Sequence, residues 1–252
     1  MARRATGIKQ LRSQNPHVLV LDAGNALTGQ PLANQSRGLA VVEAMNLMGY
    51  DALALGPLEL QLSEDELRAV IQQARFAVLS ANVVDSSGAL FAKPYVVVEA
   101  GGHRVALVGL TRQQSAHPTL RVTDPVAAAR QYVPQAAQEA GLVVVLSNAG
   151  TGVNRQIAAQ TPGIAVLVNA GSQEDPTQPQ AISPTRTLLV GAGYEGIWLG
   201  ILRLQLDKAS AITSHTGELL GLDRRVPDDP ELAALVERYK AQFGISTPTP
   251  AP

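Results

Sequence analysis

An apolar run that stops at a glycine-punctuated loop constrains this chain more than any other sequence feature. The run Val18–Leu21 is rich in β-branched residues and leucine, and Asp22 follows it before the loop 23–31. This pattern is typical of a buried parallel strand that delivers side chains to its carboxyl edge, where α/β proteins usually place their chemistry. The loop presents Asn25, a neutral amide, where a carboxylate would be most useful.

The first eighty residues continue in a β-α-β rhythm. Amphipathic and capping patterns predict helices that follow Ser36 and Ser63, with Gly49 ending the first of these two. We expect helices over 2–14, 38–48 and 63–74, and strands over 17–22, 51–55 and 76–80.

The rhythm then changes. Two strand-like runs joined by Gly101 and Gly102 predict a hairpin, which makes part of the sheet antiparallel. The rest of the sequence predicts helices over 125–140, 153–159 and 229–243, buried strands over 142–146 and 164–168, and three successive antiparallel strands over 188–190, 198–206 and 211–219. Residues 246–252 are rich in Pro and Thr and are expected to be extended.

Composition limits the classes of function. The chain has 252 residues, 46% of them hydrophobic, which suits one globular domain, expected over 1–244 with a flexible tail over 245–252. A formal net charge of -1 and no Lys/Arg block argue against nucleic acid as a partner. The absence of cysteine excludes disulfides and thiolate metal sites.

No membrane span or export signal is expected. The sequence has no apolar run near the roughly 20 residues that cross a bilayer. Residues 1–9 carry the charges of a signal peptide without the apolar core that must follow them. The compartment stays unknown at this stage.

Several strand-end motifs together carry a resemblance to a known family. The segments 21–27, 49–59, 79–82, 145–148 and 168–173 resemble, in order and spacing, the catalytic domain of bacterial 5'-nucleotidases, which are calcineurin-like metallophosphoesterases. The resemblance implies a four-layer α-β-β-α sandwich of two mixed sheets. Members of the family are often periplasmic or extracellular, and they carry a second, carboxyl-terminal domain that this sequence does not show.

The resemblance also implies a two-metal phosphoesterase, in which a metal-bound hydroxide attacks a phosphate. The family's bridging aspartate matches Asn25, whose amide cannot offset two dications as a shared carboxylate does. Its metal-binding asparagine matches Pro57, its leaving-group histidine matches Leu58, and a further histidine matches Asn148. These matches predict a site that has lost its ligands.

The remaining family positions agree with this interpretation. The terminal Gly-His-x-His motif reads 170–173, which places Gly171 and Gln173 where imidazoles are expected. Glu59 follows the altered dyad, and the resemblance gives it a role in bracing its loop. We therefore predict a degenerate member with no cofactor and no catalytic residue, and with a drier cleft covered by Leu58 and Pro57.

One expectation concerns the first strand of the resembling fold. That strand carries an Asp-x-His pair ahead of the opening helix, whereas this sequence starts at Met1 inside the helix. Its loss would leave the strand 17–22 with an apolar, unpaired edge. We expect the opening helix, upstream residues or another subunit to cover it, which favours a protein partner or a homo-oligomer.

Other candidate sites have simpler structural explanations. The four histidines show no ligand-like spacing (His17, His103, His117 and His215). The glycine motif 191–196 matches G-x-G-x-x-G but leads into a strand-like run, which favours a turn over dinucleotide binding. Asp22 and Glu59 could form an acid/base pair, yet strand-end and loop-bracing roles fit them better.

Three functions remain open. The first is a non-catalytic binding or structural scaffold. The second is a metal-dependent phosphoesterase that acts on nucleotides or related phosphate esters, with a metal site rebuilt from residues such as Asp22, Glu59 and Asn148. The third is a small-anion sensor that uses the loop amides around Gly24 and Gly171.

Overall fold

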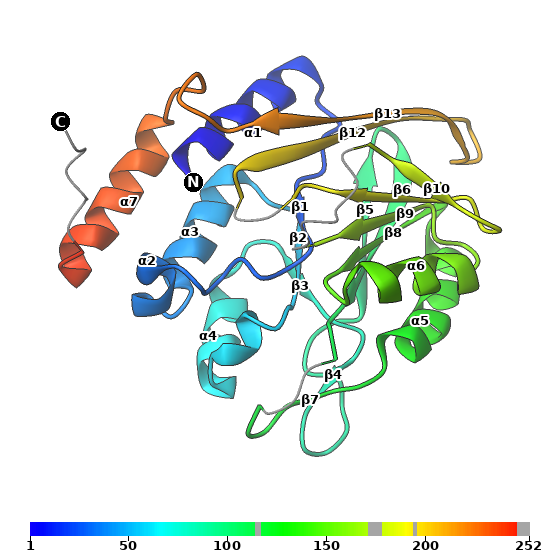
Figure 1. Cartoon of the computed structure of the whole chain (residues 1–252), viewed down its shortest axis with the longest axis horizontal. Helices are drawn as coiled ribbons and strands as arrows, with labels where there is room; N and C mark the ends of the chain where they lie inside the picture. The colour runs from blue at the N-terminus through cyan, green and yellow to red at the C-terminus, as the bar shows by residue number, and fades with distance from the viewer. Residues whose placement is uncertain (114–116, 171–177, 194–195, 246–252) are drawn as a thin grey trace.

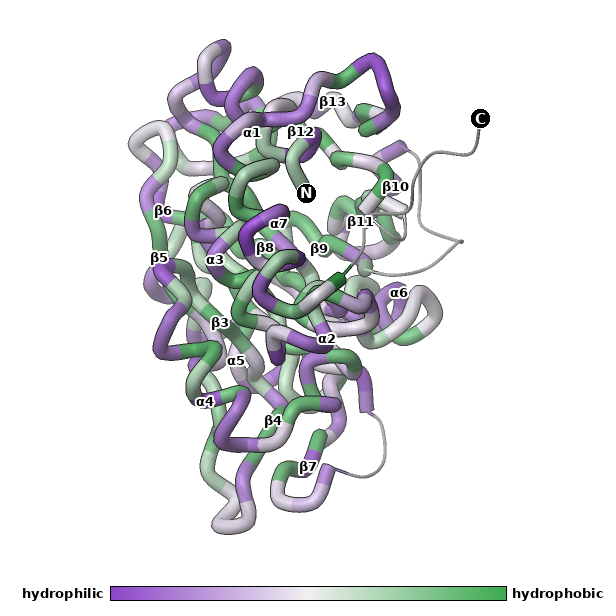
Figure 2. Tube along the Cα trace, turned by 90° about the vertical axis from the view of Figure 1, so that its left-hand side faces the viewer, coloured by the Kyte–Doolittle hydropathy of each residue, from purple (hydrophilic) through white to green (hydrophobic). Residues whose placement is uncertain are grey.

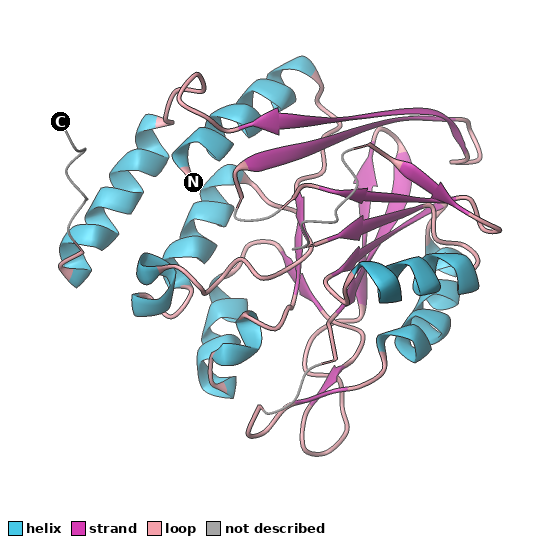
Figure 3. Cartoon of the chain, viewed as in Figure 1, coloured by secondary structure: helices cyan, strands magenta, loops and turns pink. Residues whose placement is uncertain are grey.

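The protein is built in layers, with two sheets packed between two groups of helices (Figure 1). The computed structural model describes residues 1–113, 117–170, 178–193 and 196–245. Figure 3 shows helices on one side of the molecule, strands in the middle and further helices on the other side. This is the four-layer α-β-β-α arrangement that the sequence resemblance implied.

The smaller sheet contains three parallel strands in the order β1-β2-β3. They are β1 (Leu21–Asp22), β2 (Ala52–Ala54) and β3 (Ala77–Leu79). The expected strand over 17–22 is shorter than predicted because the Val20 amide donates to the Asp51 carboxylate (2.7 Å) instead of to a neighbouring backbone. β1 has one sheet neighbour, β2, in the described ranges.

The larger sheet contains six strands in the order β10-β11-β9-β8-β6-β5. β5 and β6 form the predicted antiparallel hairpin, and β6, β8, β9 and β11 run parallel to one another. The bounds are β5 (Tyr95–Ala100), β6 (His103–Leu110), β8 (Leu142–Ser147), β9 (Val166–Asn169), β10 (Gln180–Ile182) and β11 (Thr187–Gly191).

The orientation of β11 corrects one sequence-based expectation. Residues 188–190 were expected to open a run of three antiparallel strands, but β11 is parallel to β9. The reason is β10, which the sequence pattern missed: it pairs antiparallel with β11 and reverses the chain before β11 begins. The other two strands of the run, β12 (Trp198–Leu206) and β13 (Ile212–Gly221), do form an antiparallel pair.

One group of α-helices forms the outer layer beside the smaller sheet (Figure 3). Ser63 caps one of them in a complete capping box with Glu66, and Gly49 ends another in the left-handed conformation, as predicted. The helices are α1 (Ala2–Gln14), α2 (Pro31–Gln35), α3 (Leu39–Met48), α4 (Glu64–Gln73) and α7 (Pro230–Phe243).

Two helices, α5 (Pro125–Glu139) and α6 (Thr151–Gln160), cover the outer face of the larger sheet. Three short elements complete the fold: η1 (Glu59–Gln61), β4 (Val83–Val84) and β7 (Arg121–Val122), the last two of which pair with each other. None of the helices in the described ranges has the length and hydropathy that a membrane span requires.

Apolar side chains hold the layers together. Figure 2 shows hydrophobic segments through the interior of the molecule, while helices carry both colours along their length. One cluster lies between the sheets and includes Leu79, Leu107 and Leu146, all fully buried. A second cluster connects α1 with the segment just before β1, because it contains Ala5 and Ile8 of the helix together with Val20. Burial on this scale is the main favourable contribution to folding.

Candidate functional site

The carboxyl ends of strands from both sheets meet at one place. Polar side chains from five segments converge there, and we call them the strand-end cluster: Asn25, Glu59, Asn82, Thr111 and Asn148. Parallel strands bring their carboxyl ends to a common edge, which explains why residues so far apart in the chain become neighbours.

Glu59 is the first residue of η1, after β2, and its fully buried carboxylate reaches into the loop after β1. Its two carboxylate oxygens accept four hydrogen bonds from backbone amides, namely those of Gly56 (2.7 Å), Asn25 (2.8 Å), Ala26 (2.7 Å) and Leu27 (2.9 Å). Hydrogen bonds to a buried charged group are stronger than those between neutral groups. Glu59 therefore fixes the whole loop from within the protein.

The same contacts bear on the anion-sensor hypothesis. The amides that follow Gly24 are the donors that a small anion would need, but three of them already bind the Glu59 carboxylate. The Gly24 amide donates to Asp22 Oδ1 (3.0 Å). This half of the proposed anion site is therefore filled by the protein's own carboxylates, and the Gly171 half lies outside the described residues.

Asn25 is half-buried and adopts a left-handed backbone conformation (φ 66°) that asparagine tolerates better than most residues. Its Oδ1 accepts a hydrogen bond from the Leu58 amide (3.0 Å). The side chain therefore joins the loop after β1 to the loop after β2. Its oxygen is used for a contact within the protein.

Asn148 joins the two sheets. Its Nδ2 donates to the carbonyls of Ala23 and Leu55, both at 2.9 Å, while its Oδ1 accepts from the Arg112 amide at the same distance. The side chain is almost fully buried, with 3% of its surface exposed. Each polar atom of this amide has a partner, as expected of a buried polar side chain.

Thr111 and Asn82 extend the cluster under the larger sheet, and sequence reasoning missed Thr111. Its hydroxyl donates to the Leu55 carbonyl (2.8 Å), and its backbone groups bond both ends of the Asn82 amide. Ser80 Oγ lies 2.7 Å from Thr111 Oγ1. A hydroxyl directly after the apolar strand β6 was the available sequence signal.

Pro57 and Leu58 lie in the turn that leads to Glu59, and both are half-buried. Besides the contact to Asn25, the Leu58 backbone accepts a hydrogen bond from Thr28 Oγ1 (2.7 Å). The Leu58 side chain lies close to Gly29: a Cβ added at Gly29 would be 3.2 Å from Leu58 Cδ1. Leu58 thus packs against the end of the loop after β1.

Asp22 is the second carboxylate of this region. Burial raises its pKa to about 6, an effect that the nearby Arg4 guanidinium and the Gly24 amide partly offset. Arg4 Nη1 lies 3.4 Å from the Tyr50 hydroxyl, and Arg4 Nη2 donates to the Gly196 carbonyl (3.3 Å). The pKa near 6 means that this carboxylate changes charge close to neutral pH.

The remaining predicted positions are not brought into the cluster by any described contact. Gly171 and Gln173 lie outside the described residues. His103 Nδ1 lies 2.8 Å from Ser210 Oγ, and His117 Nε2 lies 3.0 Å from the Leu62 carbonyl, both away from the cluster. In the glycine motif, Gly191 ends β11, and β12 rather than a helix begins soon after the motif, at Trp198, as the sequence predicted.

The sequence and structure comparisons now add to this geometry. The chain is 29% identical over 273 residues to a 5'-nucleotidase of Bos taurus and 27% identical over 272 residues to one of Homo sapiens, with 96% of this chain covered in both cases. A 5'-nucleotidase precursor of Thermus thermophilus superposes over 96% of this chain and 53% of its own, with a TM-score of 0.86 and 29% identity. The chain is a 5'-nucleotidase homologue.

Further comparisons fix the fold and the extent of the match. A calcineurin-like phosphoesterase of Bacillus subtilis covers 96% of this chain and 88% of its own, with a TM-score of 0.81 and 20% identity. No protein-family profile matches the sequence. The chain spans about half the length of its 5'-nucleotidase relatives, 47% for the bovine protein.

These comparisons correct the expectation that no cofactor is used. The relatives are 5'-nucleotidases and a calcineurin-like phosphoesterase, proteins of the metal-dependent class that the sequence resemblance implied, so the prediction of no cofactor is wrong for such a homologue. The described residues do not themselves fit a dimetal centre, because among them no three or more His, Cys, Asp or Glu side chains lie together so that they could hold a metal ion. Both Glu59 oxygens and the Asn148 amide already have protein partners.

Proposed function

We propose that this 5'-nucleotidase homologue is a non-catalytic member of its family that acts as a binding or structural scaffold. One observation carries the proposal: the polar groups at the strand ends are used within the protein. The Asn25 oxygen, the Asn148 amide and the Glu59 carboxylate make hydrogen bonds that join the loops to one another. A catalytic site leaves such groups free to meet a substrate.

The electrostatics support the same proposal. A phosphate ester is anionic, and the groups that receive it in an enzyme supply positive charge or free N–H donors. In the loop after β1, the backbone donors of Asn25, Ala26 and Leu27 face a buried carboxylate instead. Glu59 is thus an internal acceptor for donors that would otherwise be available to a phosphate.

A direct assay tests the proposal. Purified protein would be incubated with AMP and with p-nitrophenyl phosphate, alone and with added Mn²⁺, Mg²⁺ or Zn²⁺, beside the bovine 5'-nucleotidase as an active control. We expect no turnover above that of the buffer. Turnover that EDTA abolishes and added metal restores would contradict the proposal, and metal analysis of the same sample would identify the ion.

The comparisons favour a second candidate function, a metal-dependent phosphoesterase acting on nucleotides or related phosphate esters. Its support is the match of 96% of this chain to proteins named 5'-nucleotidase. A divalent cofactor belongs to this candidate. Because the chain spans about half the length of those relatives, the assay is to be repeated with any longer form of the protein.

The scaffold proposal includes a protein partner or a second copy of the chain. It rests on β1, which pairs with β2 alone in the described ranges, and on the partly exposed apolar residues Val18 and Leu19 beside it. An open strand edge is a common place for association. A mass measurement in solution, together with hydrogen exchange over residues 17–22, tests this part: a monomer with fast-exchanging amides at 21–22 would contradict it.

A further inference from the structure

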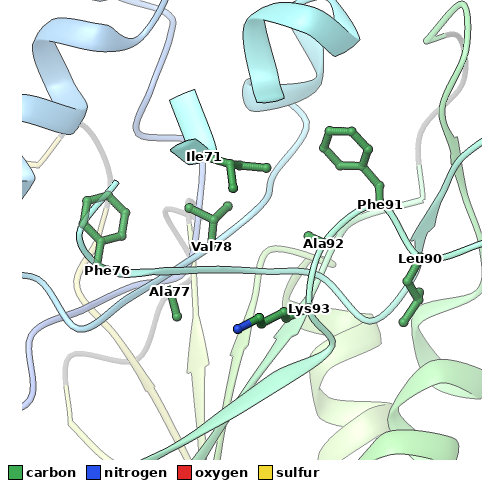
Figure 4. A pocket seen from close by; sticks show the side chains of 8 residues that line it. All are labelled: Ile71, Phe76, Ala77, Val78, Leu90, Phe91, Ala92 and Lys93. Atoms are coloured by element: carbon green, nitrogen blue, oxygen red, sulfur yellow. The ribbon is translucent and has the colours of Figure 1, made fainter. Parts of the chain in front are cut away.

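A cavity of about 480 Å³ lies away from the strand-end cluster, on the outer edge of the smaller sheet (Figure 4). It is bounded by α4, by the start of β3 and by the loop that precedes β5, and it shares no residue with the cluster. The volume falls within the range of small-molecule sites. Its lining residues are Ile71, Phe76, Ala77, Val78, Leu90, Phe91, Ala92 and Lys93.

The aromatic side chains that line this cavity contact neighbouring side chains. The Phe76 ring packs against Tyr50, with ring centroids 6.4 Å apart. The Arg68 guanidinium lies 4.8 Å from the centre of the Phe91 ring, and the Glu64 carboxylate holds that guanidinium at 2.6 Å. Aromatic and cation–π contacts of this kind fix ring positions. The cavity is therefore preformed.

The loop that forms the far wall is also fixed. The Phe91 amide donates to the Val83 carbonyl, and the Ser80 amide donates to the Lys93 carbonyl, both at 2.9 Å. These bonds connect the two ends of the wall to the backbone near β3 and β4. A ligand would therefore enter without having to order this segment, which lowers the entropic cost of binding.

Two donors belong to residues that line the cavity: the backbone N–H of Val78 and the ammonium of the exposed Lys93. The Ala77 amide and the Leu79 carbonyl bond toward β2, so the alternation of the strand points the Val78 N–H to the opposite edge, where it has no partner among the described residues. Lys93 extends from the loop toward Ala77 (Figure 4). Within the described ranges its ammonium has no carboxylate within 4.0 Å, since it forms no ion pair.

We propose that this cavity binds an amphipathic monocarboxylate, a small molecule with an apolar body and one anionic head. The walls of Ile71, Phe76 and Phe91 suit the apolar body. The Lys93 ammonium and the Val78 N–H are donors without internal acceptors, and a carboxylate can accept from both. A dianionic phosphate ester fits less well, because a single ammonium would face two negative charges.

Octanoate is a suitable probe, with 1-octanol as the matched neutral molecule. Calorimetric titration of the protein should give saturable octanoate binding that is at least several times tighter than octanol binding. In ¹H–¹⁵N spectra, the largest amide shifts should fall on Val78 and Lys93. The substitution Lys93→Gln should weaken octanoate binding by about tenfold while leaving octanol binding unchanged. Lys208→Gln, at an exposed lysine elsewhere, is the matched control.

A second variant tests the site itself. Ala92 lines the cavity and is partly exposed, so the larger side chain of Ala92→Leu should fill the cavity and abolish binding of both probes. Circular dichroism would check that each variant is folded. Equal affinity for octanoate and octanol, absence of saturable octanoate binding, or binding that neither Lys93→Gln nor Ala92→Leu alters would each overturn the proposal.

Discussion

Asn148 Nδ2 donates to the Ala23 carbonyl over 2.9 Å, and this bond connects the end of β8 in the larger sheet to the loop that follows β1 in the smaller one. The same nitrogen donates to the Leu55 carbonyl at the end of β2. A single buried amide thus holds three loops in register. The strand-end cluster is tied together by side-chain hydrogen bonds to backbone, a use that competes with ligand binding.

Asn148→Asp tests this role with almost no change in shape. The new carboxylate oxygen would face the carbonyls of Ala23 and Leu55, which are both acceptors, so two favourable contacts become repulsive. We expect the free energy of unfolding at pH 7 to fall by about 3 kcal/mol. Urea denaturation measures it. Asn15→Asp is the control, because the exposed Asn15 uses only its Oδ1, which aspartate retains, and should change stability little.

Glu59→Gln tests the carboxylate at the centre of the loop. Glutamine would place an NH₂ group against backbone N–H donors that now share two charged oxygens. The protein should lose about 3 kcal/mol of stability, and the amides of residues 25–27 should exchange faster with solvent. Glu237→Gln, on the exposed side of α7, serves for comparison. Unchanged exchange at 25–27 would show that Glu59 does not hold the loop.

Gly24→Ala tests the close packing at the same place. Gly24 has a φ of +103°, and an added Cβ would lie 2.5 Å from Asn148 Nδ2 and 2.7 Å from the Ala54 carbonyl oxygen. Gly88 has a similar φ of +86° but no atom within 4 Å of its Cβ position, which makes Gly88→Ala the matched control. We expect Gly88→Ala to cost about 1 kcal/mol and Gly24→Ala roughly 3 kcal/mol or more. Equal melting temperatures for the two variants would contradict this packing.

Asp22→Asn isolates a pH effect. Burial raises the folded-state pKa of Asp22 from 3.8 to about 6, so between those values the folded protein binds more protons than the unfolded chain. The contribution of this carboxyl group to the free energy of unfolding must therefore fall as pH rises from about 4 to about 6, by up to about 3 kcal/mol. The variant should therefore gain stability over the natural protein above pH 6 and not below pH 4.

Denaturation at pH 4, 5, 6 and 7 would reveal this difference. The quantity to follow is the stability of Asp22→Asn minus that of the natural protein, because other titrating groups cancel in the subtraction. Glu99→Gln, at an exposed position on β5, should show a flat difference over the same range. A flat difference for Asp22→Asn as well would show that the Asp22 carboxyl is not buried in an unfavourable environment.

The sequence by itself determined the local elements whose signals lie within a few residues. Ser63 and Glu66 close a capping box, and Gly49 ends α3, because these contacts depend only on neighbours in the chain. The motif order also predicted the four-layer fold, which the comparisons with solved structures support. Asn25 and Asn148 were singled out because each follows an apolar run, and the family resemblance gave Glu59 its role in bracing its loop.

Only the tertiary structure decided the partners of those residues. β11 runs parallel to β9 because β10 reverses the chain first, and no local pattern in 187–191 carries that information. Likewise, three of the amides that bind Glu59 belong to the loop after β1, more than thirty residues earlier in the chain, and the two carbonyls that bind Asn148 belong to loops of the other sheet. Hydrogen bonds between segments more than ninety residues apart depend on the path of the whole chain, which sequence periodicity does not encode.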